Sequence, residues 1–211
     1  MSRLDASRAA GASGARGGFV LYLEGPGDRG ILHAWCRRVL PSAAGLLSRC
    51  SVILGGRQPA RAVEHFRGLG GAAAGTRGLC LLDRDDGHGP ESGESSEPGL
   101  EFFTWGRRHI ESYLLVPAAI RRGLRLPDAD GRVERAFREH IPRGDDEEAY
   151  RDLDAKRILG PGGPLARALG GPVPVARVAG ATRVSELHAD VHDFFSRLRR
   201  ELGAHDATGA R

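Results

Sequence analysis

The sequence has few cysteines, a single lysine and no long apolar run, and each shortage excludes a class of protein. No stretch of about 18 apolar residues is present, so no membrane span is expected, and the N-terminus lacks the apolar core of a secretion signal. We therefore expect a cytoplasmic protein. Its three cysteines, Cys36, Cys50 and Cys80, are odd in number, far apart and set in apolar patterns. This arrangement is typical of buried thiols rather than of a disulfide framework or a zinc site.

Lysine is almost absent, because Lys156 alone stands against 30 arginines among the 31 basic residues. The excess of alanine, glycine and arginine indicates a GC-rich genome, whose codon bias replaces lysine by arginine wherever only a surface charge is needed. A compact ammonium and a planar guanidinium are not interchangeable. Lys156 is therefore a candidate for chemistry that arginine cannot perform, with chance survival at the surface as the alternative.

The chain of 211 residues, 40% of them hydrophobic, suffices for one domain of ordinary size with a helical elaboration. Residues 1–18 are small, polar and aperiodic, and we expect a flexible tail there. The division predicted for the rest is a core domain over 19–126 and a helical elaboration over 127–211, which carries Lys156 and a terminal amphipathic helix.

Short apolar runs alternate with helical spacing along the core domain. Strands are predicted at 19–24, 51–54, 79–82 and 101–105, helices at 31–39, 59–69 and 185–202, and a further short strand at 173–178. Strands that alternate with helices at these separations predict an α/β fold with a mainly parallel, four-stranded sheet between helices and right-handed crossovers.

Acidic residues follow three of the four predicted strands. Glu24 and Asp28 follow the first, Asp83 and Asp85 the third, and Glu111 lies after the fourth. The carboxyl ends of parallel strands share one edge of a sheet, where ligands bind. Carboxylates gathered there repel one another unless cations are present, and hard oxygen ligands favour Mg²⁺ or Mn²⁺. This set could hold two ions in the arrangement that cleaves phosphodiesters.

The motifs LEGPGDRGIL, LLDRDD, RRHIESYLL and DAKRIL follow one another between residues 19 and 160. In this order they resemble the Toprim domain of the OLD (overcoming lysogenization defect) family of nucleases, and more loosely other Toprim modules. The glutamate after the first strand and the DxD after the third are the shared Toprim signature. The OLD branch is indicated by Asp28, by Glu111 within HIESYLL and by Lys156.

The resemblance implies a Toprim-like, Rossmann-like fold and metal-dependent nicking or cleavage of DNA, with RNA as the second choice. It implies a two-ion site with Mg²⁺ or Mn²⁺ held by Glu24, Asp28, Asp83, Asp85 and Glu111. It also implies a catalytic role for Glu24 as general acid or base and for Lys156 as the group that stabilises charge on the phosphoryl oxygens. The sequence contains no GxxxxGK[ST] motif, so we expect a stand-alone effector of anti-phage defence or DNA processing with its ATPase in a separate chain. Whether it forms a homodimer is left open.

Arginines cluster around the segment that carries Glu111. A basic rim beside an acidic pocket is what a binder of the phosphate backbone needs, and a solvated helix face is the alternative. The predicted nucleic-acid contacts are Arg107, Arg108, Arg121 and Arg122.

Other functions fit parts of the same pattern. Gly25, Gly27 and Gly30 form a GxGxxG motif, which suggests a dinucleotide-binding oxidoreductase, with Arg57 as a contact for the phosphate of NADP. No acidic residue occurs between Asp28 and Glu64 to accept ribose hydroxyls, which disfavours NAD. An aspartyl-phosphate enzyme, a calcium loop and a Toprim module that binds nucleic acid or a partner without cutting it are further alternatives.

Overall fold

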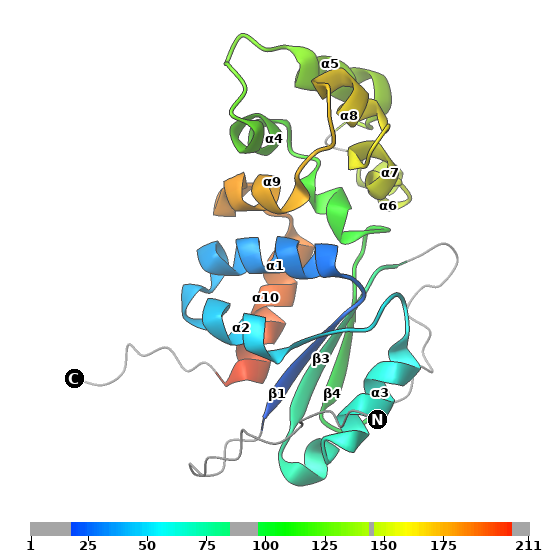
Figure 1. Cartoon of the computed structure of the whole chain (residues 1–211), viewed down its shortest axis with the longest axis vertical. Coiled ribbons are helices and arrows are strands. Elements are labelled where there is room, and N and C mark those ends of the chain that lie inside the picture. Colours follow the sequence, from blue (N-terminus) through cyan, green and yellow to red (C-terminus); the bar gives the residue numbers. More distant parts are fainter. Residues whose placement is uncertain (1–17, 85–96, 144–145, 204–211) are drawn as a thin grey trace, which may run out of the picture.

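A computed structural model describes residues 18–84, 97–143 and 146–203 (Figure 1). Its centre is a parallel sheet of four strands in the order β2-β1-β3-β4. The strands are β1 (Phe19–Leu23), β2 (Ser51–Ile53), β3 (Arg77–Leu82) and β4 (Leu100–Thr104). All four strands predicted for the sheet are confirmed, each to within two residues at either end.

Both faces of the sheet are covered by helices, which explains why its strands are apolar without alternation. Successive side chains of a strand point to opposite faces, and Leu21 and Leu23 pack with α1 (Pro26–Val39), α2 (Ala44–Cys50) and α10 (Ala189–Leu202). Val20 and Tyr22 pack on the other side with α3 (Pro59–Gly68). The predicted α/β fold, with a parallel four-stranded sheet between helices, is therefore confirmed.

Helices follow β4 and lead back to the sheet through α10 (Figure 1). The first of them, the 3₁₀ turn η3 (Ile110–Leu114) and α4 (Pro117–Leu124), belong to the predicted core domain. The helical elaboration adds α5 (Arg132–His140), α6 (Glu147–Arg151), α7 (Ala155–Leu159), α8 (Pro164–Leu169), α9 (Val175–Ala181) and the 3₁₀ turn η4 (Val184–Glu186). Two more 3₁₀ turns, η1 (Pro41–Ala43) and η2 (Gly71–Ala74), precede it. Helix α9 packs against α1 and α4, and α10 packs against β3. Both predicted segments therefore contribute to one core.

The short strand predicted at 173–178 is wrong, because α9 occupies most of that range. Pro174, at its N-cap, has no N–H to give to a strand ladder, and its fixed φ suits the start of a helix. Val178 and Ala179 are then fully buried on the side facing α1 and α4. The three valines of this segment favour a strand by their β-propensity, which explains the wrong prediction.

Three further features concern the apolar helices, the cysteines and the N-terminal tail. Within the three described ranges, no helix is long and apolar enough to cross a membrane. Cys36 and Cys80 are buried thiols and Cys50 is partly buried, as expected. The predicted tail over residues 1–18 lies outside the described residues except for Gly18.

Candidate functional site

The candidate site lies at the carboxyl edge of the sheet, where β1 and β3 end side by side. Glu24 follows β1 directly, and Pro26 then starts α1, so Asp28 falls in the first turn of that helix. Asp83 follows β3, and Glu111 lies on η3 beyond β4. The parallel order of the strands thus gathers acids that are far apart in the sequence.

Asp83 is the centre of this site, with 3% of its surface exposed. Its Oδ1 accepts a hydrogen bond from the Ile110 N–H at 3.1 Å, and its Oδ2 lies 2.5 Å from Lys156 Nζ. Its own N–H donates to Glu24 Oε1 at 2.7 Å, and its carbonyl accepts from Arg57 Nη1 at 2.6 Å. These contacts fix both carboxylate oxygens and tie the ends of β1 and β3 together.

Glu111 and Asp28 are buried carboxyls that form no salt bridge with any residue the structure describes. Burial raises the pKa of Glu111 to about 7, although the charge of Lys156 opposes that rise. Its Oε2 is buried, and no described residue forms a hydrogen bond with it. Burial also raises the pKa of Asp28, whose Oδ2 accepts the Gly25 N–H at 2.8 Å. Two carboxyls that are hard to ionise therefore flank Asp83.

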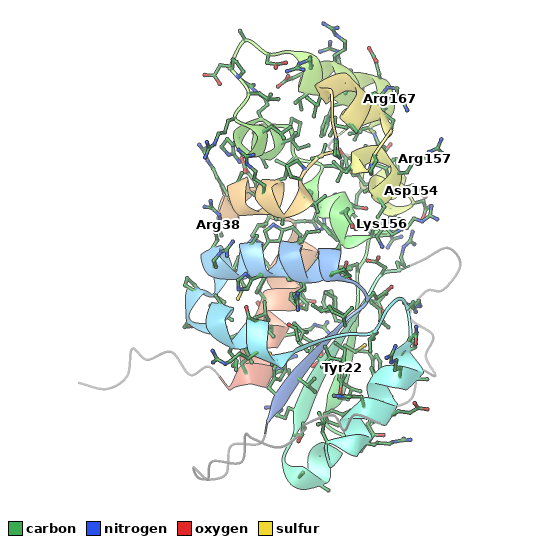
Figure 2. The ribbon with its side chains drawn as sticks, in the orientation of Figure 1. Tyr22, Arg38, Asp154, Lys156, Arg157 and Arg167 are labelled. Atoms are coloured by element: carbon green, nitrogen blue, oxygen red, sulfur yellow. The ribbon has the colours of Figure 1, made fainter. Side chains whose placement is uncertain are left out.

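Lys156 reaches the acids from the helical elaboration (Figure 2). It lies on the one-turn helix α7, which packs against η3 and is capped by Asp154 accepting the Arg157 N–H at 2.9 Å. Burial opposes its charge, but the hydrogen bond and the attraction to Asp83 outweigh burial and raise its pKa. The side chain is still 46% exposed, so the ammonium is accessible from solvent as well.

The donor set fits a divalent cation. Asp28 and Glu111 offer hard oxygen atoms, and Glu111 Oε2 is buried with no partner among the residues described. Asp83 is close enough for its charge to raise the pKa of both carboxyls. A cation would offset the desolvation that makes these carboxyls hard to ionise. No group of three or more acids, histidines or cysteines already stands in metal-binding geometry within residues 18–84, 97–143 and 146–203.

The structure brings together Glu24, Asp28, Asp83, Glu111 and Lys156, which the sequence predicts to form one site. Asp85 lies outside the described residues. The roles of these side chains as metal ligands or catalytic groups stay predictions.

Arg107, a predicted contact for nucleic acid, has protein partners in this structure. It is 8% exposed and forms a bidentate ion pair with Glu147, at 2.9 and 2.6 Å, while donating to the Ser112 carbonyl at 3.1 Å. Its guanidinium also lies 4.4 Å from the ring centre of Tyr150. These contacts give Arg107 a structural role and disfavour its binding a phosphate; its role as a nucleic-acid contact stays a prediction.

The other predicted arginines differ in their surroundings. Arg121 pairs with Asp128 and Glu134, and Arg122 donates to the Ala181 carbonyl and pairs with Glu186. Arg108 adjoins the site, because its charge is among the causes that lower the pKa of His109.

Two residues that contact the acids or their neighbours stand out only weakly in the sequence. The GxGxxG motif suggests Arg57 as a contact for NADP, yet this residue holds the Asp83 carbonyl. His109 is 7% exposed, and burial, followed by the charge of Lys156, lowers its pKa. The position of His109, two places before Glu111, is the signal for it; nothing in the sequence directs Arg57 toward Asp83.

The GxGxxG segment lies beside two carboxyl groups. The Gly25 N–H, which would face a pyrophosphate, is bonded to Asp28, and a Cβ on Gly27 would lie 4.0 Å from Glu111 Oε1. The donor that a pyrophosphate needs is therefore already taken, and the ionised form of either carboxyl would repel a dinucleotide. The glycines of this turn leave room for the two acidic side chains instead.

No family model matches the chain, and no curated protein matches it. Among solved structures, the C-terminal region of the Burkholderia pseudomallei OLD protein is similar, with a TM-score of 0.52 and 17% sequence identity. The similarity covers 89% of this chain and 98% of that one. At this identity the likeness establishes the fold, and the Toprim-like α/β arrangement predicted from the motifs is confirmed.

Proposed function

We propose that this chain is a divalent-metal-dependent phosphodiesterase that nicks or cleaves DNA. The observation that carries the proposal is the convergence of buried carboxyls on Asp83 with Lys156 2.5 Å away. The fold shared with a region of an OLD protein supports the same conclusion.

The metal would be held by Asp28, Asp83 and Glu111, with Glu24 and Asp85 as further ligands. Mg²⁺ or Mn²⁺ would supply charge neutralisation and an activated water, and two ions would suit phosphodiester cleavage. The chain itself positions the groups around that site. The Ile110 N–H orients one oxygen of Asp83, and Glu24 holds the Asp83 backbone by accepting its N–H.

Lys156 would stabilise the negative charge that develops on the phosphoryl oxygens. Its pairing with Asp83 keeps the ammonium charged, and its partial exposure leaves it accessible to a phosphate. Glu24 accepts the Asp83 N–H through one carboxylate oxygen, and the other could serve as a general acid or base.

The test is conversion of a supercoiled plasmid to nicked and linear forms with Mg²⁺ or Mn²⁺, against EDTA. Asp83→Asn retains an acceptor for the Ile110 N–H and should abolish conversion, as should Glu111→Gln. Glu64→Gln, an exposed glutamate on α3, makes the same chemical change away from the site and should cut normally. A structured RNA tested in parallel separates DNA from RNA as substrate. Equal cleavage by all three variants would refute the proposed site.

A second candidate is a Toprim module that binds nucleic acid without cutting. It is favoured by Lys156 already engaging Asp83 and by the lack of preformed metal geometry among the residues described. DNA binding in EDTA, without cleavage in Mg²⁺, Mn²⁺ or Co²⁺, would establish this alternative.

We further propose that the activity is controlled by an ATPase, in a system for phage defence or DNA processing. The support is the similarity to the C-terminal region of an OLD protein. Co-purification of a tagged chain with an ATPase, and ATP-dependent cleavage by the pair, would test it.

A further inference from the structure

The stretch of sequence that begins after Asp28 carries only positive charge. No acid occurs from residue 29 to residue 63, while six arginines and His33 do. Arg29, His33 and Arg37 recur every four residues of α1 and lie on its accessible side. Four residues of a helix rise about 6 Å, so Arg29 and Arg37 lie about two turns apart, and His33 between them is hydrogen-bonded to Ser48 Oγ at 2.9 Å and to Arg37 Nη1 at 3.4 Å. This row starts beside Asp28 and leads away from the acidic site.

The row ends in a basic groove of about 520 Å³ between α1, α4 and α9. Five arginines line it, and no acid does among the residues described: Arg37, Arg38, Arg122, Arg125 and Arg177. Small residues such as Ala176 and Gly180 also line it. Figure 2 shows Arg38 at one end of α1 and Lys156 beyond the other.

Most of these charges are left without a carboxylate. Arg38 donates to the Gly180 carbonyl at 2.8 Å, which fixes its guanidinium without neutralising it. Arg122 alone pairs with an acid, Glu186, among the groove arginines in the part of the chain that the structure describes. Arg125 and Arg177 are exposed and form no salt bridge within the described ranges. Arginines that have no acidic partner remain available for an external anion.

Arg125 also occupies a backbone position that disfavours it. It ends α4 in the left-handed conformation, at φ 56°, where α8 and α10 have Gly170 and Gly203. A side chain in that conformation costs about 1 kcal/mol or more relative to glycine. This chain has 31 glycines and still places an arginine there. A strained residue held at the rim of a groove is typical of a functional position.

We propose that the row on α1 and the groove at its end, together the basic track, bind the phosphate backbone of the DNA that flanks the cleaved bond. This inference rests on the proposed function. The ten steps from Asp28 to Arg38 span about 15 Å of helix, so the track would engage phosphates several nucleotides from the metal site. A phosphate backbone is favoured over an acidic protein because the track presents an extended row of guanidinium and imidazole groups that leads directly from the carboxyls proposed to act on a phosphodiester.

The test is the salt dependence of DNA binding, measured by fluorescence anisotropy in EDTA with a labelled duplex of about 30 base pairs. The slope of log K against log salt is negative, and each lost phosphate contact reduces its magnitude by about 0.9. Arg125→Ala combined with Arg177→Ala should therefore reduce the magnitude of the slope by about two and weaken binding at low salt. Arg49→Ala combined with Arg199→Ala removes the same charge from exposed positions at the ends of α2 and α10, and should leave the slope unchanged.

Arg125→Gly separates binding from folding. It relieves the left-handed strain, so the melting temperature should rise while DNA affinity falls. An unchanged slope in the double variant, or an equal fall in the control, would overturn the track. Displacement of DNA by poly-glutamate at equal charge concentration would indicate an acidic protein partner and would also overturn it. Because binding is measured without metal, the two proposals can fail separately. Absence of cleavage would refute only the proposed function. Normal cleavage together with an unchanged slope in the double variant would refute only the basic track.

Discussion

Replacing Glu111 by glutamine should make the metal-free protein more stable relative to the wild type as the pH rises from 5 to 8. The pKa of Glu111 is raised to about 7 from an ordinary 4.5, chiefly by burial. A raised pKa in the folded state gives stability that is complete below pH 4.5 and lost as the pH passes 7. One pKa unit corresponds to about 1.4 kcal/mol, so the wild type should lose roughly 2.5 kcal/mol between pH 5 and pH 8 through this group.

The glutamine variant has no such loss, because its amide does not titrate. The side-chain amide nitrogen of the variant takes the place of Glu111 Oε2, which has no partner among the described residues. A buried amide without an acceptor costs about 1–3 kcal/mol at every pH. The difference between the two pH values cancels this constant cost. In a chain of this size 1 kcal/mol moves the melting temperature by about 2–4 °C, so the variant should gain about 5–10 °C on the wild type across that range.

Thermal melts at pH 5 and pH 8, in EDTA and in Mg²⁺, measure this directly. Mg²⁺ should stabilise the wild type at pH 8 by about 2.7 kcal/mol at a hundredfold excess over its dissociation constant, and should not stabilise the variant. Glu64→Gln should follow the wild type in all four conditions. If Glu111→Gln also follows the wild type, then Glu111 is not a buried carboxyl that a cation relieves.

Three further predictions concern neighbours of that carboxyl. Asp83→Asn and Asp83→Ala should both lose metal-induced stabilisation. The alanine variant should be less stable than the asparagine variant by about 1–3 kcal/mol, because the Ile110 N–H loses its acceptor. Equal melting temperatures of the two variants would contradict that hydrogen bond. Lys156→Ala should slow plasmid cleavage about 10²–10³-fold with little loss of Mn²⁺ binding by calorimetry, and Lys156→Arg should restore only part of the rate; full activity of the arginine variant would show that only charge matters there. Arg107→Ala should lower stability by about 2 kcal/mol, through its lost bonds to Glu147 and the Ser112 carbonyl, and leave DNA affinity unchanged; a stable variant with weak DNA binding would restore Arg107 as a contact.

The sheet can be predicted from the sequence because its strands are buried on both faces. Continuous apolar runs such as Phe19–Leu23 are each followed by a glycine or an acid, and this change marks the end of the strand. The acids at the carboxyl edge follow from the same pattern, since parallel strands end together. The segment at 173–178 is harder, because its three valines favour a strand while its proline also suits the start of α9.

Partners of charged side chains cannot be predicted in the same way. Arginine supplies nearly all the positive charge, so its identity does not distinguish Arg107, which is buried on Tyr150, from Arg125, which is exposed. Only the fold brings Glu147 to Arg107, 40 positions earlier in the chain. Lys156 is an exception, because its rarity in the composition alone sets it apart from the other basic residues.

The attachment of Lys156 to α7 has a consequence during synthesis of the protein. All the described acids of the site lie at or before residue 111, and the lysine follows 45 positions later. At translation rates of about 5–20 residues per second, the carboxylate edge would emerge from the ribosome several seconds before the ammonium that completes it. A nascent or truncated chain would thus carry the acids without their cationic partner, and cleavage would begin only once α7 had docked on η3. If the chain acts as proposed, this order of residues would protect the cell's own nucleic acid while the protein is incomplete.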